Sequence, residues 1–144
     1  MSQVTVEPDF FPLAILEQNG KKASLKDLVR DLSSQLGWSL EECYNLILRL
    51  KQNRQLWIVR TLCFRSPFLR EVLADDWNKT LVFRYRPDAI NYVFELEAKM
   101  LAEIRRTKAF NTRGGAIRKV KRFTREILIN QLGFHPYELE FLRR

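Results

Sequence analysis

The sequence predicts a mainly helical protein with a small β-hairpin, and three observations support this fold class. Two segments, residues 24–36 and 39–54, begin with a helix-capping signature and continue with apolar residues at helical spacing. Two runs rich in β-branched and aromatic residues, 56–64 and 80–86, follow them and are typical of strands. A wide apolar stripe over residues 88–109 then predicts a long helix.

The first two capped helices are the best-defined elements. Ser24 lies three residues before a carboxylate, and apolar residues then recur at i, i+3, i+4, i+7 and i+11. Gly37 is expected to end this helix in the left-handed conformation, and a second capping box, from Ser39 to Glu42, begins the next helix at once. A short helix over residues 10–16 precedes them, so that the helices are expected to cross over one core.

The remaining elements follow from prolines and glycines. A short helix is expected over residues 67–77, between the two strand runs, because proline is favoured at the first helical position. The segment 111–115 contains two adjacent glycines and is expected to break the chain after the long helix. Two further helices are expected over residues 116–132 and 136–142, with a glycine stop between them.

Positive charge is concentrated in the second half of the chain. The net charge is +8, and residues 1–72 hold ten Lys and Arg against eight Asp and Glu, whereas residues 73–144 hold fifteen against nine. Residues 104–125 contain nine basic residues and no acidic one. Because Lys and Arg release counterions when they bind a phosphate backbone, this distribution favours a nucleic-acid partner.

The helix expected over residues 116–132 is amphipathic. Its basic residues fall on one side and its apolar residues on the other: Arg118, Lys121, Arg122 and Arg125 against Ala116, Val120, Phe123 and Ile127. A solvated surface helix or an acidic membrane or protein surface are the alternatives to nucleic acid. The preceding Gly114 and Gly115 could form a hinge or bring backbone amides close to a phosphate.

Catalytic and metal chemistry is not expected. Cys43 and Cys63 lie among apolar neighbours without a CxxC spacing, which is typical of core cysteines in a reducing compartment. His135 is the sole histidine and precedes a proline, so it is expected to be a surface or capping residue. We therefore expect no enzyme activity, no cofactor and no metal.

Neither secretion nor membrane insertion is expected. The first nine residues contain neither a basic segment nor an apolar one, and no stretch approaches 18 uncharged apolar residues. The expected location is the cytoplasm, with association with the nucleoid as a further possibility for a nucleic-acid-binding protein.

The order of elements resembles a winged helix-turn-helix domain over roughly residues 10–87. The resemblance implies a domain over residues 1–87, followed by a helical extension over residues 88–144. Since many winged-helix proteins dimerise through a helix after the wing, it also implies a homodimer through residues 88–109. The resemblance is carried by the capped helix 24–37, the turn at Trp38-Ser39, the helix 40–54 and the strand runs 56–64 and 80–86.

In that family the second helix of the motif enters the major groove, and the wing lies along the backbone. The resemblance thus implies that Asn45, Arg49, Gln52 and Asn53 face the bases and that Arg60, Arg84 and Arg86 contact phosphates. The charge pattern adds a second set of expected phosphate contacts, namely Arg113, Arg118, Lys119, Lys121, Arg122 and Arg125.

The sequence therefore predicts a nucleic-acid-binding protein, with DNA favoured over RNA. A transcriptional regulator and a replication-associated or architectural DNA-binding factor both fit the residues. Two alternatives remain: an RNA-binding protein, in which the same basic helix recognises a structured RNA, and an adaptor subunit that docks a protein within a larger nucleoprotein assembly.

Overall fold

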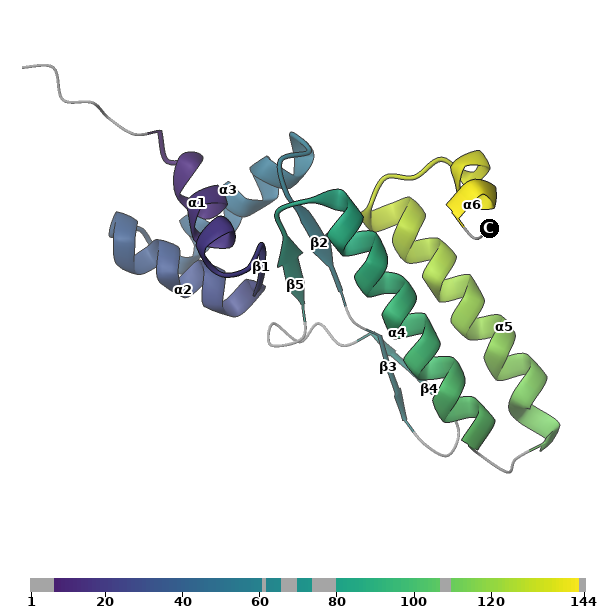
Figure 1. Ribbon diagram of the computed structural model, residues 1–144. Helices are drawn as coiled ribbons and strands as arrows, with labels where there is room; N and C mark the ends of the chain where they lie inside the picture. Colours follow the sequence, from purple (N-terminus) through teal and green to yellow (C-terminus); the bar gives the residue numbers. More distant parts are fainter. Residues whose placement is uncertain (1–6, 61, 66–69, 74–79, 107–109, 143–144) are drawn as a thin grey trace, which may run out of the picture.

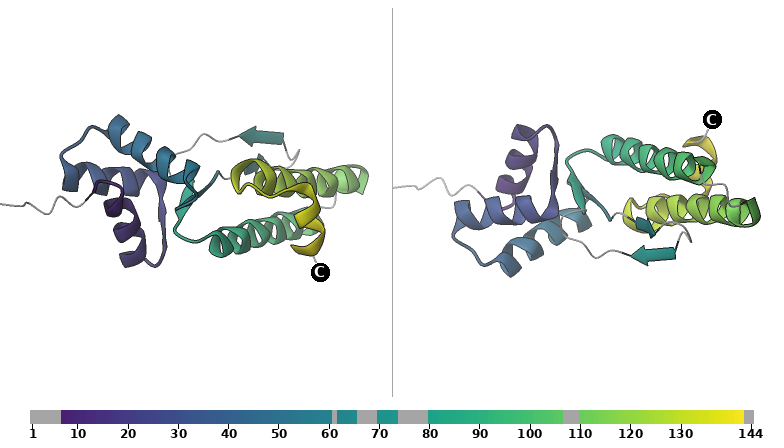
Figure 2. Two further views of the ribbon diagram at one scale, coloured as in Figure 1. Left: turned by 90° about the horizontal axis from the view of Figure 1, so that it is seen from above. Right: turned by 90° about the horizontal axis from the view of Figure 1, so that it is seen from below.

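A computed structural model describes residues 7–60, 62–65, 70–73, 80–106 and 110–142. Three helices, α1 to α3, lie at one end of the molecule, and a long helical pair, α4 and α5, lies at the other (Figure 1). A small sheet stands between them, and Figure 2 shows the same separation from two other directions. The predicted fold class, mainly helical with a small β component, is confirmed.

The N-terminal helices are α1 (Phe10–Gln18), α2 (Leu25–Leu36) and α3 (Leu40–Gln52). The backbone N–H of Asp27 donates to the Ser24 hydroxyl at 3.1 Å, and Ser39 with Glu42 forms the expected capping box. Gly37 ends α2 at a φ of 70°, in the left-handed region that a side chain disfavours. The capping residues thus set these helix ends as the sequence predicts.

The central sheet has three antiparallel strands in the order β1-β5-β2. Its strands are β1 (Lys22–Ser24), β2 (Trp57–Val59) and β5 (Leu81–Phe83). Strand β5 lies in the middle, where Val82 pairs with Ala23 on one side and Ile58 on the other. The sequence does not predict β1, because a three-residue strand is too short to show an alternating pattern.

The sheet contributes to two hydrophobic cores, one on each face. Ile58 and Val82 belong to a core formed with α1, α2 and α3. The neighbouring residues Val59 and Phe83 belong to a second core formed with the C-terminal helices. Since successive side chains of a strand point to opposite faces, short strands can link two helical layers in this way.

The C-terminal helices are α4 (Arg86–Arg106), α5 (Phe110–Glu126), η1 (Ile127–Gln131) and α6 (Pro136–Leu142). Helices α4 and α5 lie side by side, and the π-helical segment η1 continues α5 toward the sheet (Figures 1 and 2). Far from the sheet, the pair is held by Ile104 and Val120, both almost fully buried. Among the described helices, none is both long and apolar enough to cross a membrane.

The helix predicted over residues 67–77 is wrong where the structure describes this segment. Residues Arg70–Leu73 form strand β4, which pairs antiparallel with β3 (Leu62–Arg65). Proline at a first helical position is a weak signal, because an isolated short helix is only marginally stable in water, whereas Arg70–Leu73 pairs with β3 over four residues. Residues 66–69 and 74–79 of the prediction lie outside the described residues.

The break predicted at residues 111–115 is also wrong, because α5 begins at Phe110 and passes through this segment. Gly115 lies inside the helix and is not among the residues with positive φ. A glycine costs a helix interior about 1 kcal/mol, which the packing of α5 against α4 can offset. The loop expected to approach a phosphate at Gly114-Gly115 is therefore helical, while residues 107–109 lie outside the described chain.

Candidate nucleic-acid interface

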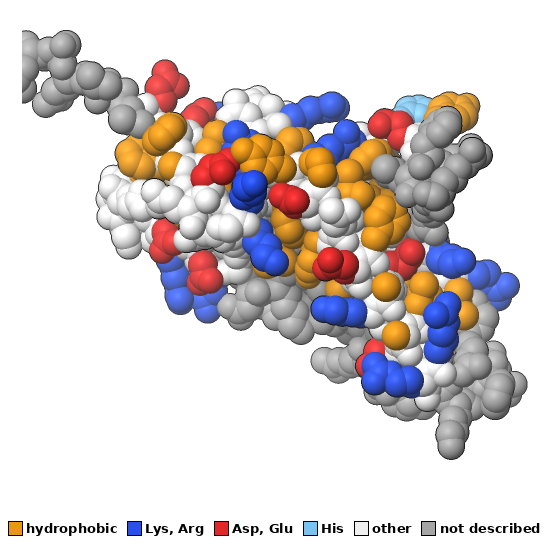
Figure 3. Space-filling view, in the orientation of Figure 1, with side chains coloured by type: hydrophobic (Ala, Val, Ile, Leu, Met, Phe, Trp, Pro, Cys, Tyr) orange, Lys and Arg blue, Asp and Glu red, His pale blue; other side chains and the backbone are white. Residues whose placement is uncertain are grey.

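The outer face of α5 carries a row of exposed cations. Val120, Phe123 and Ile127 are buried on the opposite side of the helix, so α5 has the predicted amphipathic arrangement. The buried Thr124 hydroxyl donates to the Val120 carbonyl at 3.0 Å, which satisfies the polar group on the inner face. Figure 3 shows Lys and Arg side chains along α5. The exposed cations are Arg118, Lys119, Lys121, Arg122 and Arg125.

One described carboxylate lies close to this row. Arg122 Nε is 4.0 Å from an oxygen of Glu126, one helical turn away, and both side chains are more than half exposed. An exposed pair of this kind contributes at most about 1 kcal/mol and weakens with salt. The ion pair thus leaves Arg122 able to exchange Glu126 for a phosphate.

The outer face of α3 carries both signs of charge. Asn45, Gln52 and Asn53 are exposed. Arg49 is exposed as well, but its guanidinium forms an ion pair with Asp9, next to the start of α1. The first turn of α3 also presents the acidic side chains of its capping segment, which would repel phosphates. This face is therefore less suited to a phosphate backbone than the face of α5.

Arg84, predicted to contact a phosphate, is held within the protein. Its Nη1 donates to the Gln55 carbonyl at 2.8 Å, and its Nε lies 3.7 Å from a Glu17 oxygen. The guanidinium carbon also lies 4.9 Å from the centre of the Tyr85 ring. These contacts connect the end of β5 to α1 and to the segment after α3, which is a structural role.

Arg86 has both a structural contact and an open side. Its Nε donates to the Leu132 carbonyl at 3.2 Å, and its guanidinium carbon lies 3.7 Å from the centre of the Phe134 ring. It thereby fixes the start of α4 to the turn after η1. The same residue lines a cavity that a ligand can enter.

The other two predicted phosphate contacts lie apart from each other. Arg60 is exposed just after β2, and its backbone N–H donates to Gln131 Oε1 at 2.7 Å. Arg113 lies in α5, but its side chain is outside the described part of the structure. Arg60 thus lies beside η1 rather than on the face of α5.

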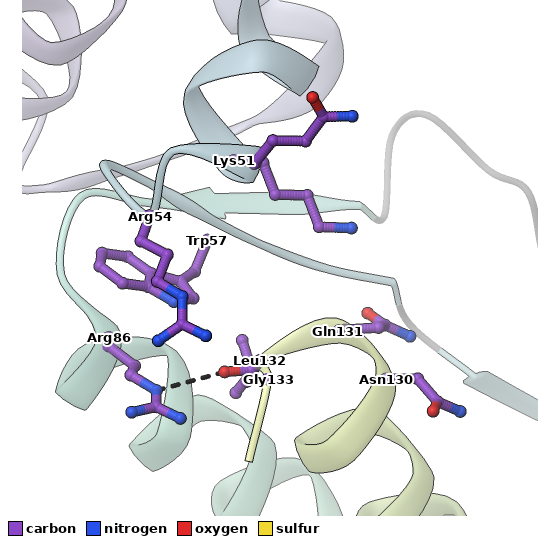
Figure 4. Close-up of a pocket in the computed structure, with 9 residues that line it drawn as sticks. Lys51, Arg54, Trp57, Arg86, Asn130, Gln131, Leu132 and Gly133 are labelled. Carbon is purple, nitrogen blue, oxygen red and sulfur yellow. Dashed lines mark hydrogen bonds between the residues drawn. The ribbon is translucent and has the colours of Figure 1, made fainter. Parts of the chain in front are cut away.

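The sequence did not single out four polar residues that the structure brings to one cavity. Lys51 in α3, Arg54 just after it, and Asn130 and Gln131 at the end of η1 all line one cavity of about 240 Å³ (Figure 4). A neighbouring cavity of about 600 Å³ shares Lys51 and Gln131 and adds Arg60. A cluster of basic residues at 51–54 is visible in the sequence, but its partners come from the other end of the chain.

Lys51 is in an unfavourable environment for a cation. Its partial burial, and secondarily the positive charge of Arg60, lowers the pKa of Lys51 below that of an exposed lysine. The negative charge of a bound anion would favour the charged form of Lys51 and so oppose this lowering of its pKa. The local electrostatics therefore favour a negative ligand at this end of α3.

The described residues contain no candidate metal site. No group of three or more His, Cys, Asp and Glu side chains in the described chain could hold a metal ion. Cys43 is a free, fully buried thiol whose pKa is raised by desolvation and by the nearby Glu42. His135 caps α6, since its Nδ1 accepts from the backbone N–H of Tyr137 at 3.3 Å. Cys63 has a side chain outside the described residues.

Comparison of the chain with protein families, with curated proteins and with solved structures gave no match. The exposed cations of α5 and the cavity beside η1 are therefore the two features of the structure that indicate a function.

Proposed function

We propose that this chain is a non-catalytic nucleic-acid-binding protein that grips phosphates through the basic face of α5, with DNA as the favoured partner. The single observation that carries this proposal is the group of exposed cations on α5, four of which, Arg118, Lys121, Arg122 and Arg125, lie on one side opposite a buried apolar face. These four place charges along one side of a helix, where a phosphate backbone can lie, and the helix behind them packs against α4. A regulator and an architectural or replication-associated factor both use binding of this kind.

We further propose that the N-terminal part is a winged helix-turn-helix. Two features support it: the order α1, β1, α2, α3, β2 and β5, and the antiparallel strand order β1-β5-β2. The β3-β4 hairpin would then be the wing. Because the outer face of α3 carries both signs of charge, this unit would support the basic helix and add base contacts through Asn45 and Gln52.

Homodimerisation through residues 88–109 stays a prediction. Much of the apolar stripe of α4 packs within the protomer, with Val93 and Ile104 buried and Ile90 and Phe94 packed against the same core as Val93. Sedimentation equilibrium measures the oligomeric state directly. A dimer would bring two α5 faces to one nucleic acid.

The binding proposal is tested by removing three cations from α5. Fluorescence anisotropy compares the wild type with the variant Arg118→Ala, Arg122→Ala, Arg125→Ala on duplex DNA, single strands and structured RNA over a salt series. A slope of about −0.9 per neutralised phosphate on duplex DNA predicts that the triple variant reduces the steepness of log K against log salt by about 2 to 3. Affinity near physiological salt should fall by at least tenfold.

A control variant of equal charge separates this effect from net charge alone. Lys26, Arg30 and Lys99 lie on α2 and α4, and Arg30 and Lys99 are exposed. Their triple substitution to alanine should leave the salt slope within about one unit of the wild type. Equal losses in both triple variants, or an unchanged slope in the α5 variant, would refute the proposal. Tighter binding to structured RNA than to duplex DNA would show that RNA, and not DNA, is the favoured partner.

A further inference from the structure

The cavity beside η1 is formed where the two helical layers meet. One wall comes from the end of α3 and the chain that leads into β2, with Lys51, Arg54 and Trp57. The other wall comes from the start of α4 and the end of η1, with Arg86 and Asn130 (Figure 4). Three cations and side-chain amides thus meet in about 240 Å³. None of the residues that line the cavity carries a carboxylate.

The cations of the cavity are not neutralised by described neighbours. Within the described part of the chain, the side chains of Lys51 and Arg54 have no ion-pair partner. The pKa of Lys51 is lowered first by its partial burial and then by the positive charge of Arg60, which lines the neighbouring cavity. Cations brought together without a counter-charge repel one another, and an anion between them would relieve this repulsion.

The two arginines are positioned for one shared ligand. Figure 4 shows the guanidinium of Arg54 directed toward Arg86 and the Leu132 carbonyl. The hydrogen bond to Leu132 and the Phe134 ring fix the guanidinium of Arg86, so its orientation does not depend on a ligand. Arg54 follows the end of α3 and has a φ of 59°, a backbone conformation that residues other than glycine rarely adopt. Paired guanidinium groups suit the oxygens of a phosphate.

The cavity has room for more than a phosphate ion. A water molecule takes about 30 Å³ in the liquid, so 240 Å³ corresponds to about eight waters. The half-buried indole of Trp57 lines the same space and offers an apolar surface to a sugar or a base. Asn130 and Gln131 add amide groups that can donate to a ligand or accept from it.

We propose that this cavity binds a nucleotide, with its phosphate group held by Arg54 and Arg86, its sugar or base against Trp57, and Lys51 contacting the ligand from the other end of the cavity. The site is separate from the basic row of α5, so its occupancy does not depend on the proposed nucleic-acid interface. The nucleotide is either a free mononucleotide or the phosphorylated end of a nucleic acid. The shared chemistry is the phosphate on the paired arginines.

Isothermal titration calorimetry on the whole chain tests this proposal and distinguishes the two sources. One arm titrates inorganic phosphate, adenosine 5′-monophosphate and adenosine at constant ionic strength. The other arm titrates a short oligonucleotide with and without a 5′-phosphate. We expect the monophosphate to bind more tightly than inorganic phosphate, and adenosine to bind weakly. If the 5′-phosphate increases the affinity of the oligonucleotide while the monophosphate and inorganic phosphate bind equally weakly, the ligand is the phosphorylated end of a nucleic acid.

Three single variants assign the binding to the cavity. Arg54→Gln and Lys51→Gln should each weaken the binding by about tenfold or more, because each removes a charge-assisted contact. Arg30→Gln, which removes the same charge from an exposed position on α2, should leave it unchanged. The triple alanine variant of α5 should also retain mononucleotide binding, which separates this site from the proposed interface.

Two results would overturn the proposal. The first is an absence of binding in both arms at millimolar ligand. The second is an equal effect of Arg30→Gln and Arg54→Gln, which would show a diffuse attraction to net charge rather than a site. Circular dichroism of each variant establishes that a loss of binding reflects the removed side chain and not unfolding.

Discussion

Replacing Arg86 by methionine should destabilise the protein measurably, although the residue is only half-buried. Arg86 is the first residue of α4, and it holds two elements together through the Leu132 carbonyl and the Phe134 ring. Methionine keeps an apolar chain over the ring but removes the guanidinium. The variant Arg86→Met therefore isolates the contribution of the charged group to the junction.

The expected size of the effect follows from the two lost contacts. A hydrogen bond from a charged donor contributes about 1.5–3 kcal/mol, and a cation over an aromatic ring about 1 kcal/mol. Arg86 is half-buried, so water replaces part of both interactions in the variant. We expect the free energy of unfolding to fall by about 2 kcal/mol. With a urea m-value of about 2 kcal/mol/M, the midpoint should move down by about 1 M.

Urea denaturation followed by far-ultraviolet circular dichroism measures this shift, with Arg30→Met as the control. Arg30 is exposed on α2, and its substitution should change stability by no more than about 0.5 kcal/mol. A double-mutant cycle with Phe134→Leu should give a coupling of about 1 kcal/mol. If Arg86→Met is as stable as the control variant, or the coupling is absent, the junction does not depend on Arg86 and our reasoning is wrong.

Three further substitutions have defined outcomes in the same unfolding assay. Ser39→Ala removes the capping box of α3 and should cost about 1 kcal/mol, and a loss below about 0.3 kcal/mol would contradict the cap. Gly115→Ala should stabilise α5 by about 0.5–1 kcal/mol, because an added Cβ meets nothing within 4 Å; destabilisation would instead indicate a hinge. Lys51→Met should raise stability at pH 7, since the lowered pKa means that the fold disfavours the charged lysine. In the wild type, the lowered pKa of Lys51 makes the free energy of unfolding rise with pH between the pKa of Lys51 in the folded state and its pKa in the unfolded state. Urea denaturation at pH 7 and at pH 10 should show that Lys51→Met removes this rise.

Sequence patterns predicted the helices better than the strands, and local chemistry explains the difference. The ends of α2 and α3 depend on capping residues within a few positions, so Ser24, Gly37 and Ser39 identify them directly. Strand β1 has three residues and exists because β5 pairs with it, and β4 exists because β3 pairs with it. The partner of β1 is distant in the chain and leaves no local signal. The partner of β4 is nearby, and that segment was predicted as a helix because Pro67 is favoured at a first helical position.

The same distinction applies to the two candidate sites. The cations of α5 belong to one helix, and a single periodic pattern places Arg118, Arg122 and Arg125 on one face. The cavity requires Lys51 and Arg54 to meet residues at the other end of the chain, which only the packing of η1 against the sheet brings about. The sequence also predicted Arg84 as a phosphate contact, but its bonds to Gln55 and Glu17 appear only in the folded chain.

The position of the cavity connects its proposed ligand to the architecture. The central strands contribute Ile58 and Val82 to one core and Val59 and Phe83 to the other, so the short sheet is the main link between the two helical layers. The cavity lies at the edge of this link, and its cations come from both layers. A phosphate there would bond to Arg54 on one side and to Arg86 on the other, and its negative charge would favour the charged form of the half-buried Lys51. Ligand binding and the rigidity of the junction would therefore increase together, and a nucleotide in this cavity would hold the basic face of α5 at a fixed orientation to α3.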